Sequence, residues 1–134
     1  MAVDTSISAL AGAPAVGQKI QVYQREVDFS VNNLAAGAHF ALFDLDAGDV
    51  VIAAQVQTVT ADTAAADVDV GVDGGDTLIA ATDCTSAGFA TGPTAAPVSV
   101  AVASVVSVEP QTNGLTDGVL RFTCAVLKAG DFSG

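Results

Sequence analysis

The stretch Val98-Ser-Val-Ala-Val-Ala-Ser-Val-Val-Ser-Val108 places a valine at nearly every second position. One phase holds Val98, Val100, Val102, Val106 and Val108, and only Ser104 interrupts it. Successive side chains of a strand point to opposite faces, so this period of two predicts one strand with a buried face. Val102 would then point into the core, and the unpaired carboxylate of Val102→Asp would unfold the domain.

The same alternation recurs in three further segments. These contain Val50, Ile52, Ala54 and Val56; then Ala66, Val68, Val70 and Val72; and finally Leu120, Phe122, Cys124 and Val126. With the turn residues between them, the predicted strands are Lys19–Val31, His39–Leu45, Val50–Thr60, Ala66–Val72, Thr77–Ala81, Val98–Val108 and Val119–Lys128. We interpret Asp83–Ala96 as a loop of small residues, and no segment has helical spacing.

Composition points to an all-β chain. The 134 residues suit one domain, and 51% of them are hydrophobic although only 5% are aromatic. The 13 Gly and 4 Pro interrupt the chain at short intervals, as many turns require. We therefore predict a jelly-roll-like antiparallel β-sandwich of seven to eight strands, forming a single domain over residues 19–134. Residues 1–18, which lack a sustained period, are expected to form an extended N-terminal arm that contacts another subunit.

Charge narrows the range of partners. Fifteen acidic residues against four basic ones give a formal net charge of −11, and Lys19, Arg25, Arg121 and Lys128 are scattered along the chain. Phosphate contacts need clustered Lys and Arg, so the sequence predicts binding neither to nucleic acid nor to an anionic membrane. The N-terminus lacks the basic start of a secretory signal, and no run approaches the ~18 apolar residues of a membrane helix. We expect synthesis in the cytoplasm.

The best candidate for a metal site is the acidic stretch Asp67–Asp76. Asp67 and Asp69 would project from the solvated face of a strand, with Asp73 and Asp76 in the turn that follows. Carboxylate oxygens suit Ca²⁺, but an EF-hand loop needs an oxygen ligand where Gly71 stands and a later Glu, and both are missing. The favoured interpretation is a solvated strand face that leads into a glycine turn, with no metal site.

No catalytic constellation emerges from the remaining residues. Asp44 and Asp46 lie two apart and could share a strand face, as paired carboxylates do in glycosidases, but their setting beside Gly48 is typical of turn acids. His39 is the single histidine, and no Gly-x-Ser-x-Gly elbow supplies a nucleophile for it. Phosphate-binding glycine loops are also missing. We predict no enzyme activity, no catalytic residues and no cofactor.

The two cysteines carry little functional signal. Cys124 follows the apolar alternation of the last strand and is expected to be a buried free thiol. Cys84 falls in the predicted loop. Spacing alone leaves open whether the two form a disulfide, and the lack of a secretory signal favours free thiols.

Two passages resemble small virion proteins of tailed bacteriophages. The first contains Leu34–Gly37 and Phe43–Val51, and the second contains Val59–Ala61 and Ala66–Gly71, followed by a closing strand at Leu120–Leu127. The resemblance spans about residues 28–128 and transfers no binding residue. It implies a capsid decoration, or cement, protein. Such a protein would be a homotrimer on the outer surface of the virion, bound to the major capsid protein at capsomer junctions, with its arm reaching neighbouring shell subunits.

A second function stays open at this point. A fibre, spike or tail-surface module that binds a host glycan or receptor uses the same kind of sandwich, and a fold does not decide between such roles. Sugar sites commonly expose aromatic side chains. This chain has only Tyr23 and six Phe, most of them on predicted apolar faces.

Overall fold

Every regular element of the described chain is a strand. The computed structural model describes residues 19–64, 66–74, 76–93 and 97–129, and within these ranges it contains nine strands and no helix. The strands are β1 (Ile20–Asp28), β2 (Phe40–Leu45), β3 (Val50–Thr60), β4 (Asp67–Val72), β5 (Ile79–Asp83), β6 (Gly88–Gly92), β7 (Val98–Ser99), β8 (Ser104–Pro110) and β9 (Val119–Leu127). The all-β prediction is confirmed. No helix of the described residues is long and apolar enough to cross a membrane.

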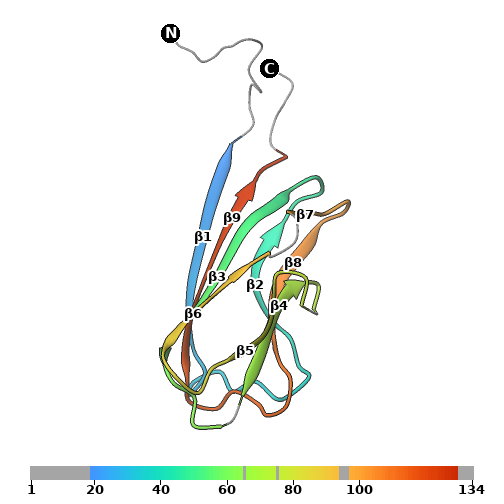
Figure 1. Cartoon of the computed structure of the whole chain (residues 1–134). Coiled ribbons are helices and arrows are strands. Elements are labelled where there is room, and N and C mark those ends of the chain that lie inside the picture. Colours follow the sequence, from blue (N-terminus) through green and yellow to red (C-terminus); the bar gives the residue numbers. More distant parts are fainter. Residues whose placement is uncertain (1–18, 65, 75, 94–96, 130–134) are drawn as a thin grey trace, which may run out of the picture.

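The strands pair in a nested antiparallel pattern. β1 pairs with β9, β2 with β8, β3 with β6, and β4 with β5. This ribbon folds into a five-stranded sheet of order β1-β9-β3-β6, in which the short β7 also pairs with β3, and a four-stranded sheet of order β2-β8-β4-β5 (Figure 1). Such nesting over two sheets is the jelly-roll arrangement of a β-sandwich, as the sequence predicts.

The core lies between the two sheets and is built from alternate residues of the strands. β9 shows the pattern most plainly, because Leu120, Phe122, Cys124 and Val126 are all buried while the residues between them are half-exposed. Burying one Val, Leu or Phe side chain contributes about 1.5–3 kcal/mol. The apolar alternation of the last strand therefore specifies which face turns inward.

A bulge in β3 changes which of its side chains point inward, so one part of the predicted inward face is wrong. Val50 and Ile52 are expected inward with Ala54 and Val56, but Val51 is fully buried and Ile52 is exposed. The register against β9 skips between Val51 and Ala53. An extra residue in one strand of a pair reverses the phase of the side chains that precede it.

The stretch Val98–Val108 forms two strands rather than one. β7 belongs to the five-stranded sheet and β8 to the four-stranded sheet, so the chain must leave one ladder and cross to the other over residues 100–103. Val100 stays buried, whereas Val102 is 67% exposed at the crossing, where its carbonyl accepts a hydrogen bond from Ser104 Oγ at 2.8 Å. The predicted inward position of Val102 is wrong because the alternation continues through a segment that is not paired.

The predicted loop Asp83–Ala96 also contains a strand. β6 pairs with β3 from Ala54 opposite Gly92 to Thr58 opposite Gly88. Its residues are small, and its large side chain, Phe89, is 65% exposed, so no apolar alternation marks it. The predicted arm, residues 1–18, lies outside the described residues, as do residues 94–96 of this segment.

The burial of Val106 and the exposure of Val102 predict a large and a small loss of stability, respectively, when each is replaced by aspartate. Val106 of β8 is fully buried, so Val106→Asp should cost at least about 3 kcal/mol and leave little folded protein. Val102→Asp should change the free energy of unfolding by less than about 0.5 kcal/mol, since the new carboxylate stays in water. Urea denaturation of both variants measures this, and equal destabilisation would contradict the sheet crossing described above.

Candidate functional site

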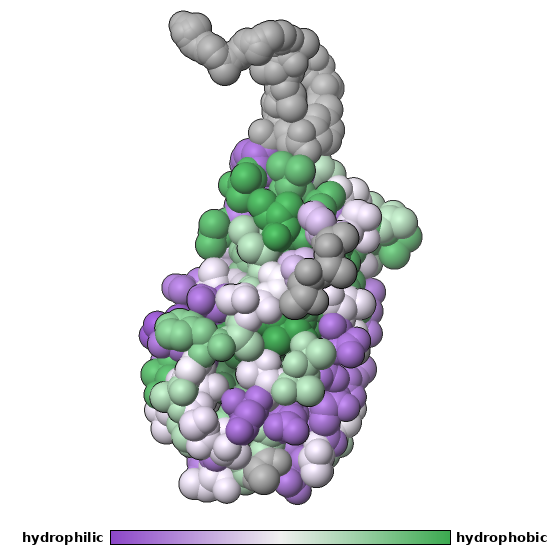
Figure 2. Space-filling view, viewed as in Figure 1, coloured by the Kyte–Doolittle hydropathy of each residue, from purple (hydrophilic) through white to green (hydrophobic). Residues whose placement is uncertain are grey.

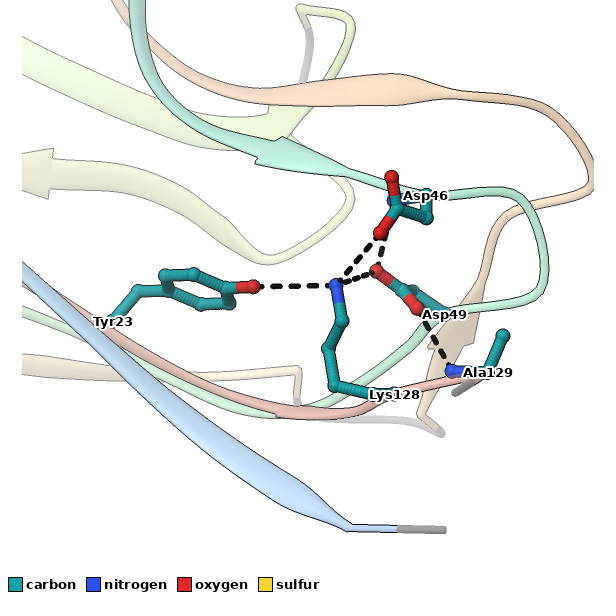
Figure 3. Close-up of polar contacts among 5 residues, drawn as sticks. All are labelled: Tyr23, Asp46, Asp49, Lys128 and Ala129. Atoms are coloured by element: carbon teal, nitrogen blue, oxygen red, sulfur yellow. Dashed lines mark hydrogen bonds and ion pairs between the residues drawn. The ribbon is translucent and has the colours of Figure 1, made fainter. Parts of the chain in front are cut away.

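A buried polar cluster joins Lys128 to Asp49 (Figure 3). Asp49 is fully buried in the turn between β2 and β3, and its carboxylate accepts hydrogen bonds from Lys128 Nζ at 2.6 Å, Asp46 N at 2.8 Å and Ala129 N at 2.9 Å. Lys128 Nζ also contacts Asp46 Oδ2 and Tyr23 Oη, each at 3.2 Å. The cluster therefore ties the end of β9 to β1 and to the β2–β3 turn.

The charges in this cluster stay fixed near neutral pH. The hydrogen bond to Asp49 outweighs burial and raises the pKa of Lys128 above its ordinary range. Burial opposes ionisation of Asp49, but its hydrogen bonds from Lys128, Ala129 and Asp46 outweigh that effect and lower the pKa. A nucleophilic or basic lysine needs the opposite shift. These contacts and shifts are those of a structural clamp between the end of β9 and the β2–β3 turn.

A second buried carboxylate, Asp62, anchors the other end of β9. Its oxygens accept the backbone N–H groups of Thr116 and Gly118 at 2.9 Å and of Asp117 at 3.1 Å, and that of Ala64 at 2.9 Å. These hydrogen bonds outweigh burial and lower the pKa of Asp62. A Cβ added at Gly118 would lie 3.0 Å from Asp62 Cβ, so the small residue lets Asp62 pack closely against the backbone here.

The acidic stretch Asp67–Asp76 does not converge on a common point. Asp69 is not on a solvated face: it is buried, and its Oδ1 accepts the N–H of Ala81 at 2.7 Å, where the β4–β5 register skips. Asp73 instead accepts the N–H of Val105 at 2.9 Å. Within the described ranges, no group of three or more His, Cys, Asp or Glu could hold a metal ion.

The other predicted candidates are also dispersed. Asp46 contacts Lys128 and Asp49, as described, whereas Asp44 is exposed on β2. His39 is half-exposed, and its Nε2 lies 3.1 Å from Glu109 Oε1. The two residues adjoin the first pair of the β2–β8 ladder, Phe40 opposite Val108. The structure therefore does not bring Asp44, Asp46 and His39 together.

Both cysteines are buried and free. Burial raises the pKa of Cys84 to about 11 and that of Cys124 to about 12, so neither is a reactive thiolate at neutral pH. Cys84 follows β5 directly instead of lying in an open loop, and its N–H donates to the carbonyl of Ala66. The predicted free thiol at Cys124 is confirmed.

Sequence reasoning missed both carboxylates that the fold buries. Asp62 carries one local signal, since its Oδ1 accepts the N–H of Ala64 two residues later, as aspartates in turns commonly do. Nothing local marks Asp49 as the partner of Lys128, which lies 79 residues away in the chain. Only the pairing of the first, third and last strands brings them together.

Comparison with known structures places the fold among capsid proteins of bacteriophages. The chain is similar to a chain of the cyanophage Pam1 capsid asymmetric unit, with a TM-score of 0.70 and 19% identity, covering 96% of this chain and 99% of that one. It is also similar to a chain in the capsid of Ralstonia phage GP4, with a TM-score of 0.66 and 16% identity, covering 92% of this chain and 93% of that one. A third similar chain belongs to the acid-stable capsid structure of Helicobacter pylori bacteriophage KHP30, with a TM-score of 0.56 and 16% identity, covering 82% of this chain and 92% of that one. No protein-family model matches the chain, and no curated protein matches its sequence.

Removing the lysine of the clamp should destabilise the domain. Lys128→Met leaves the buried Asp49 carboxylate without its cation, and breaking a buried ion pair costs about 3 kcal/mol or more. Arg121→Met is the matched control. Its pair with Glu26 at 2.9 Å is exposed and should be worth about 1 kcal/mol or less. Chemical denaturation compares the two, and an equal loss would show that Lys128 contributes no more than a surface charge.

The carboxylate of Asp62 should make the free energy of unfolding fall as the pH is lowered into the acid range. Its pKa is lower in the folded chain than the ordinary value of 3.8, so folding favours the ionised form. The contribution is complete above about pH 4 and is lost as the pH falls through the folded-state pKa. Asp62→Asn should cost about 2 kcal/mol at pH 7 and flatten the acid limb of the stability curve.

Urea midpoints measured from pH 7 to pH 2 test this expectation. Asp76→Asn, which alters an exposed aspartate, serves as the control and should keep the acid limb of the native chain. An Asp62→Asn variant with the native acid dependence would contradict the role assigned to this carboxylate.

Proposed function

We propose that this chain is a virion structural protein that decorates a phage capsid and stabilises the assembled shell. The main support is its likeness, over nearly their whole length, to chains in three phage capsid structures. Coverage of those chains is 92–99%, so a single sandwich of this size is a complete component of such capsids. The polar clusters described above, which act as clamps, support a role without enzyme activity or a cofactor.

Charge supports a place on the outside of the shell. A capsid encloses nucleic acid, and a chain with a net charge of −11 would be repelled from that polyanion. The outer surface imposes no such penalty. In this proposal the chain is made in the host cytoplasm and binds the major capsid protein at junctions between capsomers, as a homotrimer, without contacting nucleic acid or membrane.

Binding restricted to the assembled lattice would stabilise that lattice by mass action. Many symmetric copies would also act together, so each contact could be weak. Residues 1–18 belong to this proposal as an arm that adds a strand or an extended contact to a neighbouring shell subunit. Removing them should lower the number of bound copies while the domain of residues 19–134 still folds.

The alternative is a fibre, spike or tail-surface module that binds a receptor or glycan. One observation favours it: Phe89 is 65% exposed on β6 beside Gln57 of β3, an aromatic and amide pair of the kind that sugar sites use. Tyr23 offers no second platform, because its hydroxyl and ring already contact Lys128. We therefore keep decoration as the primary proposal.

The number of copies in purified particles separates the two functions. Quantitative mass spectrometry should find between about one-third and one copy per major capsid protein, as repeated symmetric binding over a lattice requires. About a dozen copies or fewer per particle would assign the chain to a tail, vertex or fibre. Complete absence from particles would refute the virion role.

A further inference from the structure

We infer that the outer surface of the five-stranded sheet, at the end where β1 begins, joins this chain to a second copy of itself. Outward-facing residues of β1, β9 and β3 form three cross-strand rows there. The first row contains Ile20, Leu127 and Val50, and the second contains Val22, Ala125 and Ala53. The third row contains Gln24, Thr123 and Gln55. We call these three rows the uncharged face.

The uncharged face exposes apolar side chains that the fold itself does not cover. Ile20 is 59% exposed and Val22 is 64% exposed, and Ile52, at the bulge of β3, adds to the same area. Figure 2 shows apolar surface gathered near the end of the molecule where β1 begins, whereas hydrophilic surface lies mainly over the opposite half. Contiguous exposed apolar surface on a soluble protein commonly marks an interface.

The absence of charge on this face is unusual for the chain. The chain has 15 acidic residues, yet the first charged row along the described part of this surface contains Glu26 and Arg121, which pair with each other. A different protein could bind such an acidic chain through complementary positive charge. Two copies of the same chain carry like charge, so carboxylates at their contact would repel. A surface free of carboxylates therefore suits self-association best.

The open edge of β1 adjoins this face. In the order β1-β9-β3-β6, β1 pairs only with β9, over all nine of its residues and without a bulge. Within the described ranges no strand pairs with the other side of the β1 backbone, so a strand from another chain can extend the sheet there. Edge strands are commonly protected by proline, by bulges or by charged side chains. Residues 20–24 of β1 include no proline and no charged residue, and their register against β9 has no bulge.

The inference rests on the proposed function in one respect, because it names the surface that would join copies of the proposed homo-oligomer. It does not depend on where that oligomer binds. Self-association in solution and occupancy on particles are separate measurements, so failure of one proposal is distinguishable from failure of the other.

The test compares two aspartate substitutions in the full chain. Val22→Asp puts a carboxylate on the uncharged face, and Val31→Asp puts one at a valine that is 77% exposed beyond the far end of β1. Light scattering across a concentration series should show the native chain as an oligomer. Val22→Asp should weaken its association at least about tenfold, and Val31→Asp should leave it unchanged. Equal melting curves for the two variants would show that both fold.

A cross-linking experiment locates the contact directly. Both native thiols are buried, so Val22→Cys supplies one accessible thiol per chain, and Val31→Cys supplies the control. A short bis-maleimide should join copies of Val22→Cys more efficiently than copies of Val31→Cys. A native chain that stays monomeric, or a Val22→Asp variant that associates like the native chain, would overturn the inference.

Particle binding separates the two proposals. If the native chain is monomeric and Val22→Asp lowers only its occupancy on particles, the uncharged face binds the shell, and self-association through it is refuted while decoration stands. If Val22→Asp weakens the oligomer but the native chain is absent from particles, the interface stands and the decoration proposal fails.

Discussion

The position of β9 between β1 and β3 is the constraint on which the rest of the structure depends. This last strand pairs along its length with both neighbours, and four of its alternate side chains point into the core. Buried carboxylates hold both of its ends, with Asp62 binding the N–H groups that precede it and Asp49 binding Lys128 and Ala129 that follow it. Among the described strands, β1 therefore joins its sheet only through β9.

Three aspartates are buried in the described part of this acidic chain. Hydrogen bonds to backbone N–H groups compensate the burial of Asp49, Asp62 and Asp69 where turns or bulges leave those groups outside the ladder. The hydrogen bond from Ala81 also occupies Asp69, one of the carboxylates that the sequence suggests as candidate metal ligands.

The sequence predicts the fold well where one strand keeps to one sheet. Leu120, Phe122, Cys124 and Val126 are buried as their alternation indicates, and the bounds of β3 are those predicted. Prediction fails at Ile52, where a bulge reverses the phase, and at Val102, where the chain changes sheets. It also misses β6, since a short edge strand of small residues needs no apolar alternation.

The sequence by itself determines the architecture class and the sign of the charge. Valine at nearly every second position with frequent turn residues specifies stacked strands, and 15 acids against 4 bases give a formal net charge of −11, which disfavours contact with phosphates. Only the tertiary structure decides which strands are neighbours, and this in turn decides that Lys128 reaches Asp49 and that β1 lies at the end of the described five-stranded sheet. The reason is physical. Alternation is a local property of each strand, whereas pairing joins residues that lie up to about a hundred positions apart, and its register is set by packing between whole sheets.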